Sequence, residues 1–129
     1  HSHTYCGNPL GAAVALSALT VLDEENIIHY VQTTLHEQLL RNMLEIANKT
    51  GKLTNIRSIG AVVAADLVVT GQNNRRFGFE LSQIAIKFGA LLRPLGNTIY
   101  WAPPLNASLS TIDELSAMTQ LSIETLNFN

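Results

Sequence analysis

The first nine residues place polar and ring side chains directly before the start of a predicted helix. They read His-Ser-His-Thr-Tyr-Cys-Gly-Asn-Pro. Asn8 is a favourable N-cap residue, and Pro9 fits the first helical turn, where its missing N–H costs nothing. Near such a helix start, the hydroxyl and backbone N–H of Thr4 suit a phosphate group. The segment is therefore either an anion-binding loop or an ordinary capped loop.

A second candidate is Arg93, which lies next to a proline in the otherwise apolar residues 91–96. Core packing does not explain a charge there, and an arginine fork matches a carboxylate bidentately. The ordinary alternative is a strand-edge arginine with its head group in water. Tyr100 and Trp101 are adjacent on a predicted strand, so they should face opposite sides of a sheet. One should pack in the core, and the other should line a pocket or an interface.

The remaining polar residues favour structural roles. Asp66, in an apolar strand, is either a buried functional acid or, more simply, a carboxylate at a strand end or sheet edge. The pair Arg75 and Arg76 is interpreted as a solvated loop pair. His1 and His3 do not supply enough ligands for a structural zinc site, and the histidines at 29 and 36 are predicted surface residues. We find no complete catalytic set in the sequence and predict no metal site.

Length and charge limit the possible partners. The chain has 129 residues, one domain's worth, with eight Lys and Arg against ten Asp and Glu. Its basic residues are scattered, whereas nucleic-acid binding requires a basic patch, so we expect no nucleic-acid partner. Its apolar runs fall far short of the roughly 20 residues that span a membrane. The single cysteine, Cys6, and the lack of a signal peptide favour the cytoplasm.

The sequence also suggests that other surfaces cover part of this domain. Charged residues make up only 14% of the chain, and the sequence does not begin with Met. The helix after Asn8 is apolar almost all round, a pattern typical of a helix buried on several sides. We therefore expect a piece of a longer protein.

Hydrophobic periodicity predicts the elements that position these residues. Acidic residues 23–25 suit the first turn of the second helix. Gly60 suggests a bulge or a close approach of the backbone to another segment. Residues 70–74 are a predicted loop. The result is an α/β (α+β) fold, with helices covering one face of a small, largely antiparallel sheet. The predicted helices run from Asn8 to about Leu22, from there to Thr50 and Gly51, over 79–88, and from a capping box at 110–113 to about Thr125. The predicted strands are one or two in 61–69 and a hairpin of 91–94 with 98–102, joined by a turn at 96–97.

Two motifs resemble segments of a known enzyme family. Residues 1–10 resemble the H-x-x-T-[YF]-x-G-N-P-L segment of class III (ω-) aminotransferases, which use pyridoxal 5'-phosphate (PLP). Residues 92–104 resemble the C-terminal signature of one branch, the adenosylmethionine-8-amino-7-oxononanoate aminotransferases of biotin biosynthesis. The resemblance implies the small C-terminal domain of a fold type I PLP-dependent transferase. Residues 1–22 would form the cofactor-phosphate loop and connecting helix from the end of the large domain, and residues 23–129 the small domain.

The resemblance also implies roles for single residues. Thr4 would bind the PLP phosphate of the neighbouring subunit in a homodimer, with His3 contributing through its backbone. Ser2, Arg93 and Tyr100 would contact substrate, Arg93 through the carboxylate of the acceptor. The Schiff-base lysine would lie outside this chain, so no catalytic residue is assigned within it.

The substrates implied by this branch are S-adenosylmethionine as amino donor and 8-amino-7-oxononanoate as acceptor. Two alternatives stay open. The chain could be part of another ω-aminotransferase that acts on a diamine or an amino acid, or it could be a non-enzymatic α/β dimerisation or binding module.

Overall fold

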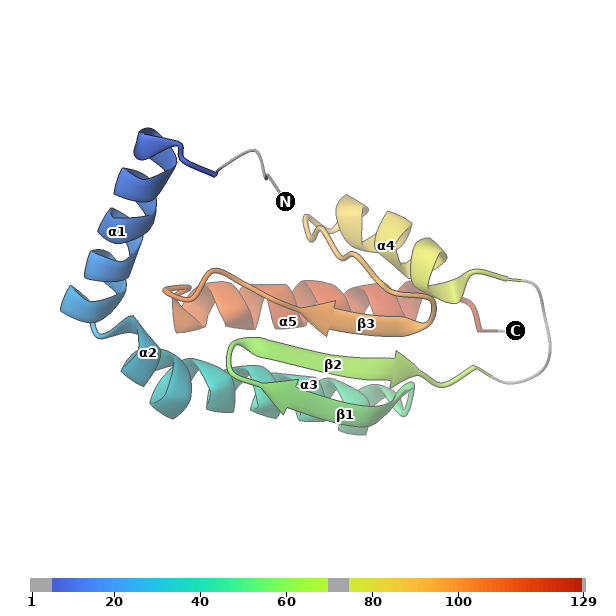
Figure 1. Cartoon of the computed structure of the whole chain (residues 1–129). Coiled ribbons are helices and arrows are strands. Elements are labelled where there is room, and N and C mark those ends of the chain that lie inside the picture. The colour runs from blue at the N-terminus through green and yellow to red at the C-terminus, as the bar shows by residue number, and fades with distance from the viewer. Residues whose placement is uncertain (1–5, 70–74, 129) are drawn as a thin grey trace.

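The computed structural model describes residues 6–69 and 75–128. A helix at the N-terminal end is followed by a long helical segment, a β-hairpin, a short helix, a third strand and a final helix (Figure 1). The elements are α1 (Pro9–Glu24), α2 (Ile27–Tyr30), a π-helical segment (Val31–Leu35), α3 (His36–Thr50), β1 (Leu53–Ile59), β2 (Val62–Leu67), α4 (Phe77–Lys87), β3 (Thr98–Trp101) and α5 (Leu109–Thr125).

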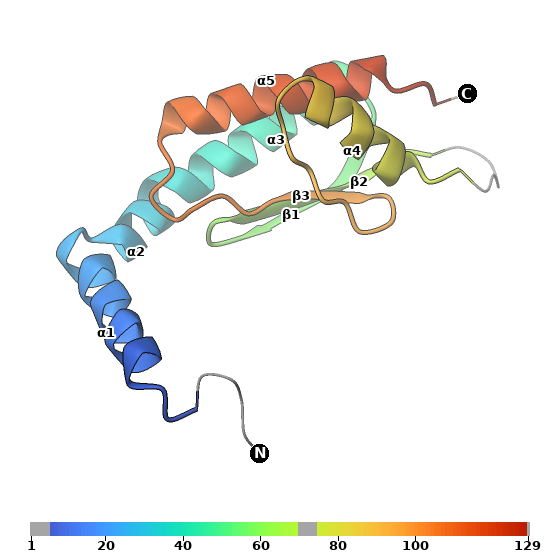
Figure 2. The same ribbon diagram turned by 90° about the horizontal axis from the view of Figure 1, so that it is seen from above.

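The sheet has three antiparallel strands in the order β1-β2-β3. Helices α3 and α5 lie on one side of it, and α4 packs beside α5 (Figure 2). The predicted α/β class, with helices on one face of a small antiparallel sheet, is confirmed. Within residues 6–69 and 75–128, no helix covers the opposite face of the sheet (Figure 2).

The core forms where alternate strand residues meet one stripe of each helix. On the sheet, Val63 pairs with Trp101 and Ala65 with Ile99, and all four side chains are at most 2% exposed. Leu35, Leu39, Met43 and Ile46 recur at helical spacing along the long helix and are buried against them. The predicted long amphipathic helix is therefore confirmed, and it ends as expected at Gly51, whose φ of 62° suits glycine.

The β-hairpin differs from the prediction in its first strand. Leu53–Ile59 forms β1, whereas the sequence interpretation began the sheet only at residue 61. Gly60 lies in the turn, with a φ of 52°, and is not a bulge. The irregularity in the register falls between Thr54 and Arg57, where Asn55 has a φ of 50°. Asparagine tolerates this left-handed conformation better than most residues, and so the strand can bulge there.

The predicted hairpin of residues 91–94 with 98–102 is wrong. Residues 91–94 are irregular, and β3 pairs with β2 instead. Pro94 has no N–H to contribute to a ladder, while the free edge of β2 offers a full row of partners. Only an isolated bridge joins Leu95 to Thr98, and this bridge closes a tight turn before β3.

Two helix starts also differ from their predictions. Asp23 and Glu24 belong to the last turn of α1, not to the first turn of the next helix, because Asn26 takes a left-handed conformation between the two helices. The final helix is capped by Ser108, whose Oγ accepts from Thr111 N at 3.2 Å, two residues before the predicted capping box. Both helix starts are set by the backbone conformation of single residues, which hydrophobic periodicity does not predict.

Helix α1 is not buried by the described part of the chain. None of its residues is buried, and Leu10, Leu16 and Leu19 are each more than 60% exposed. The helix points away from the sheet and its covering helices (Figure 2). The apolar sequence predicts a buried helix, but the described part of the chain does not bury α1. Within the described ranges, no helix is both long and apolar enough to cross a membrane.

Candidate active-site segment

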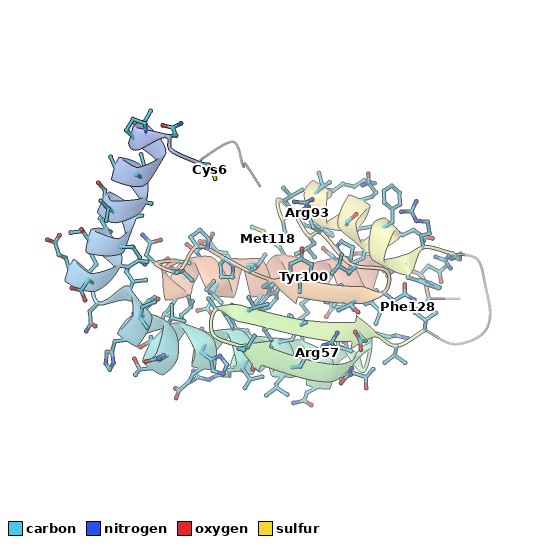
Figure 3. All side chains as sticks on the ribbon, in the orientation of Figure 1. Cys6, Arg57, Arg93, Tyr100, Met118 and Phe128 are labelled. Atoms are coloured by element: carbon cyan, nitrogen blue, oxygen red, sulfur yellow. The ribbon has the colours of Figure 1, made fainter. Side chains whose placement is uncertain are left out.

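Arg93 lies in the irregular segment between α4 and β3, and its side chain is exposed. It borders a hollow of about 540 Å³ that extends past Tyr100 and Trp101 to the side chains of Leu115 and Met118 on α5. Figure 3 labels Arg93, Tyr100 and Met118 on these three neighbouring segments. The hollow therefore combines one arginine with a largely apolar wall, an arrangement suited to a ligand with a carboxylate and a hydrocarbon part.

A second hollow lies on the other side of the same segment. It has a volume of about 430 Å³ and is lined by Arg93 together with Arg76, Phe79 and the turn at Asn97. Within residues 6–69 and 75–128, no acidic side chain forms an ion pair with Arg93. Its guanidinium is thus available to an external carboxylate, and its predicted role in substrate binding stays a prediction.

The end of α4 explains why Arg93 faces outward. Gly89 takes a φ of 95°, and the N–H of Ala90 donates to the carbonyl of Ala85 at 2.9 Å, so the chain reverses directly after the helix. Leu92 then packs into the core at 5% exposure. Because neighbouring side chains in an extended segment alternate, the next residue, Arg93, points away from the core.

Tyr100 and Trp101 face opposite sides of β3, as predicted. Trp101 is 2% exposed on the helix-covered face, and its Nε1–H donates to Thr119 Oγ1 at 3.2 Å. Tyr100 pairs with Ala64 on the open face, is half-buried and borders the hollow beside Arg93. Trp101 is therefore the core residue of the pair, and both residues border the hollow.

Asp66 is held by a dense set of hydrogen bonds. It accepts from Thr98 Oγ1 at 2.6 Å, from Asn55 Nδ2 at 2.7 Å and from the two terminal nitrogens of Arg57 at 3.1 and 3.2 Å. The bond from Thr98, followed by those from Arg57 and Asn55, lowers the pKa of this carboxyl from 3.8 to about 2. Asp66 lies next to the end of the central strand β2 and is part-exposed. It is a structural strand-end carboxylate and not a buried functional acid.

Substituting Asp66 by asparagine is expected to lower the free energy of unfolding at pH 7. A lowered pKa means that the ionised group stabilises the fold above pH 3.8 and that this contribution is lost as the pH falls towards 2. Because the side chain is 30% exposed, we expect about 1 kcal/mol after solvent screening. Urea unfolding of the two proteins between pH 7 and pH 2 should show the difference shrinking below pH 4. The exposed Asp23→Asn variant is the control, and equal stability of Asp66→Asn and wild type at pH 7 would contradict the prediction.

The N-terminus of α1 has its own donors already occupied. Asn8 Oδ1 accepts from the backbone N–H groups of Leu10 and Gly11 at 3.0 and 3.2 Å, which confirms the predicted cap. Pro9 has no N–H. A phosphate at this end of the helix would therefore depend on the residues before the cap. The predicted contacts of Ser2, His3 and Thr4 lie outside the described residues.

The other polar candidates have structural partners. Arg75, predicted to be solvated, is half-buried, forms an ion pair with Glu80 at 2.6 Å and lies over the Phe77 ring. His36 is also half-buried, with Nδ1 2.8 Å from the carbonyl of Gly60. In the described part of the chain, no group of three or more His, Cys, Asp or Glu side chains could hold a metal ion.

The contribution of α5 to the hollow was not predicted. The hollow is lined by Thr111, Glu114, Leu115 and Met118, whose helical spacing indicates only an amphipathic helix. Gly78, which lies in the first turn of α4 and is buried against the Arg93 segment, was not predicted either. A glycine inside a helical pattern is the one available signal, since it lowers helix stability and needs a packing reason.

Comparison with known proteins connects this geometry to one family. The family model described as aminotransferase class-III matches residues 1–122. The putrescine–pyruvate aminotransferase of Pseudomonas aeruginosa is 32% identical over 125 residues, which are 93% of this chain and 27% of that protein. The adenosylmethionine-8-amino-7-oxononanoate aminotransferase of Synechococcus elongatus is 35% identical over 119 residues, with 91% and 27% covered. The chain thus spans about a quarter of the length of these relatives.

Solved structures show the same fold. The adenosylmethionine-8-amino-7-oxononanoate aminotransferase from Methanocaldococcus jannaschii has a TM-score of 0.85 at 24% identity, over 98% of this chain and 30% of that chain. The acetylornithine aminotransferase from Elizabethkingia anophelis has a TM-score of 0.82 at 26% identity, over 96% and 32%. The family match over residues 1–122 establishes that the chain belongs to the class III aminotransferases.

Proposed function

We propose that this chain is the C-terminal part of an aminotransferase that moves an amino group from S-adenosylmethionine to 8-amino-7-oxononanoate in biotin biosynthesis. The observation that carries the proposal is Arg93, which has no ion-pair partner among the described residues, beside a hollow of about 540 Å³ whose walls are largely apolar apart from Thr111 and Glu114. An oxononanoate has a carboxylate at one end of a hydrocarbon chain, which is the chemistry this hollow suits. Several relatives of about 30% identity carry the name of this enzyme, which supports the same choice.

The cofactor of this class is PLP, which supplies the electron sink for amino-group transfer when it is bound. We place Thr4 and the backbone of His3 at its phosphate, in the segment before the Asn8 cap. The first backbone N–H groups of α1 already donate to Asn8, so the phosphate would have to bind the residues before the cap, which supports this placement. The lysine that carries PLP lies outside this chain in our proposal.

We assign the substrate contacts to three residues. Arg93 binds the far carboxylate of the acceptor and so orients it, a positioning role rather than a chemical one. Tyr100 borders the same hollow and contacts the acceptor there in our proposal. Ser2 contacts the substrate near the cofactor. Since the carboxylate and the reacting ketone lie at opposite ends of the acceptor, binding and chemistry are assigned to separate parts of the site.

We further propose the two-part organisation that the sequence predicts. Residues 1–22 serve as phosphate loop and connecting helix, and residues 23–129 form the small domain. The start of the core at Ile27 and the absence of buried residues in α1 support a division close to this point. The exposed apolar side chains of α1 suit the large domain and second subunit of a cytoplasmic homodimer.

A second candidate keeps the family and changes the substrates. The relative from Pseudomonas aeruginosa is named for putrescine and pyruvate, and it matches this chain as well as the biotin-pathway enzymes do. Pyruvate also carries a carboxylate that Arg93 could bind. The match of residues 1–122 to an enzyme family favours either of these over a non-enzymatic module.

Assaying the complete enzyme with matched substrate pairs distinguishes the candidates. We expect turnover of 8-amino-7-oxononanoate with S-adenosylmethionine, and kcat/KM at least about tenfold lower when putrescine or alanine replaces the donor, a difference of about 1.4 kcal/mol in transition-state stabilisation. Faster turnover of putrescine with pyruvate would support the second candidate and overturn the first. Omitting PLP after extensive dialysis is the control for both.

The isolated 129-residue chain is expected to form no specific lysine adduct with PLP. Lys49 is exposed and pairs with Glu45 at 3.6 Å, and Lys52 lies over the Phe128 ring. Lys87 is exposed at the end of α4. None of the three lines the hollow beside Arg93. Borohydride reduction followed by peptide mapping should yield only scattered modification, whereas a stoichiometric adduct at one lysine would contradict this.

A further inference from the structure

Gly78 lets the turn that follows Arg93 lie directly on helix α4. A Cβ added at Gly78 would overlap the carbonyl oxygen of Gly96 and would lie 3.0 Å from Cβ of Pro94. Carbonyl and proline ring belong to the backbone and a rigid side chain, so neither can move aside alone. Any side chain at this position therefore displaces the turn, although alanine would otherwise favour the helix.

The other side of the same turn is bound to strand β2. The N–H of Leu67 donates to the carbonyl of Asn97 at 2.9 Å, and Thr98 Oγ1 donates to Asp66 at 2.6 Å. Reciprocal bonds of 2.9 and 3.0 Å between Leu95 and Thr98 close the turn itself. The turn is thus clamped between the first turn of α4 and the end of β2.

The position of Arg93 depends on this clamp. Pro94 follows Arg93 directly and fixes its own φ, so a displacement of the turn is carried to the Arg93 backbone. In the described part of the chain, no ion pair holds the Arg93 guanidinium to another side chain. Backbone placement therefore sets which part of the hollow the Arg93 guanidinium can reach.

We propose that Gly78, together with the Thr98–Asp66 hydrogen bond, is a positioning residue for Arg93 and so sets the preference of the enzyme for acceptors that carry a carboxylate. This inference rests on the proposed function, because it requires Arg93 to bind that carboxylate. Gly78 itself touches neither substrate nor cofactor in this account.

The test compares one acceptor with and without its charge in the complete enzyme. We measure kcat/KM for 8-amino-7-oxononanoate and for its methyl ester, and we expect wild type to prefer the acid about 100-fold. Gly78→Ala should lower this preference at least about tenfold through the KM of the acid, with kcat changed less than about threefold. Gln83→Ala, exposed on the same helix, is the matched control and should keep the preference.

A second arm separates positioning from a general loss of structure. In an Arg93→Ala background, Gly78→Ala should lower the preference no further, since the group it positions is already absent. Circular dichroism reports whether each variant is folded. If Gly78→Ala does not fold, Thr98→Val replaces it in the test. This variant keeps the branched shape and removes only the hydroxyl, and it should also lower the preference for the acid.

The outcomes distinguish the two proposals. If Arg93→Ala loses the preference while folded Gly78→Ala and Thr98→Val keep it, this inference fails and the proposed function stands. If Arg93→Ala itself keeps the preference, the role of Arg93 fails and the inference fails with it. If 8-amino-7-oxononanoate is not an acceptor, the biotin-pathway proposal fails, and pyruvate and its methyl ester take its place with the same expected ratios.

Discussion

Replacing Arg93 by alanine in the complete enzyme is expected to raise the KM for 8-amino-7-oxononanoate about 100-fold. A bidentate, charge-assisted pair contributes about 1.5–3 kcal/mol, and about 1.4 kcal/mol corresponds to a factor of ten. The kcat should change much less, because the carboxylate lies far from the ketone that reacts. Steady-state kinetics with the acceptor varied at saturating donor measures both constants.

Two variants make this expectation specific to the geometry of Arg93. Arg93→Lys keeps the charge but loses the fork, so its KM should fall between those of wild type and Arg93→Ala. Arg76→Ala removes the neighbouring exposed arginine, which lines only the second hollow. If acceptor binding requires the position of Arg93 and not only positive charge nearby, this variant should keep the KM within about threefold of wild type. The absorption spectrum of bound PLP should be the same in all variants. An unchanged KM in Arg93→Ala would remove this residue from substrate binding.

Local chemistry made part of this fold predictable. The Asn8 cap, the stop at Gly51 and the opposite orientations of Tyr100 and Trp101 each depend on one or two residues and their neighbours. Such features need no knowledge of the rest of the chain. The long helix was also predictable because its apolar stripe is regular over many turns.

The incorrect predictions share a dependence on distant partners. Residues 91–94 contain apolar residues typical of a strand, yet β2 pairs with β3 and leaves them irregular. The strand Leu53–Ile59 carries a bulge at Asn55, which disrupts the alternation that would have identified it. In each case the sequence pattern was compatible with several pairings, and tertiary contacts selected one.

The candidate site divides in the same way. Arg93 was predictable because a charge in an apolar segment is unexplained by packing. Asp66 was noticed, but its role depends on Arg57 across the hairpin and on Thr98 from a strand more than thirty residues away. Gly78 gave almost no signal, because its importance comes from the closeness of Gly96, which only the folded chain brings into contact. A charged candidate such as Arg93 could therefore be identified from the sequence, whereas the close packing of Gly78 could not.

Substituting Trp101 by alanine is expected to have the largest effect on stability. Its side chain is 2% exposed, pairs across the sheet with Val63 and donates to Thr119 on α5. Large-to-alanine changes of buried aromatic residues cost about 3–5 kcal/mol, because the surroundings close the cavity only in part. Since whole domains are stable by only about 5–15 kcal/mol, this one change should remove a large share of the total. Urea unfolding followed by circular dichroism measures the loss.

Tyr100→Ala is the matched control for Trp101→Ala, because the two side chains are adjacent on β3 and face opposite ways. Tyr100 is half-buried on the open face, so its loss should cost about 1 kcal/mol of unfolding free energy. Its effect should instead appear in the KM of the acceptor, since Tyr100 borders the hollow beside Arg93. Trp101→Phe keeps most of the apolar volume, so its loss of unfolding free energy should lie between those of Tyr100→Ala and Trp101→Ala. Equal losses of stability for Trp101→Ala and Tyr100→Ala would mean that the open face of the sheet is covered in solution.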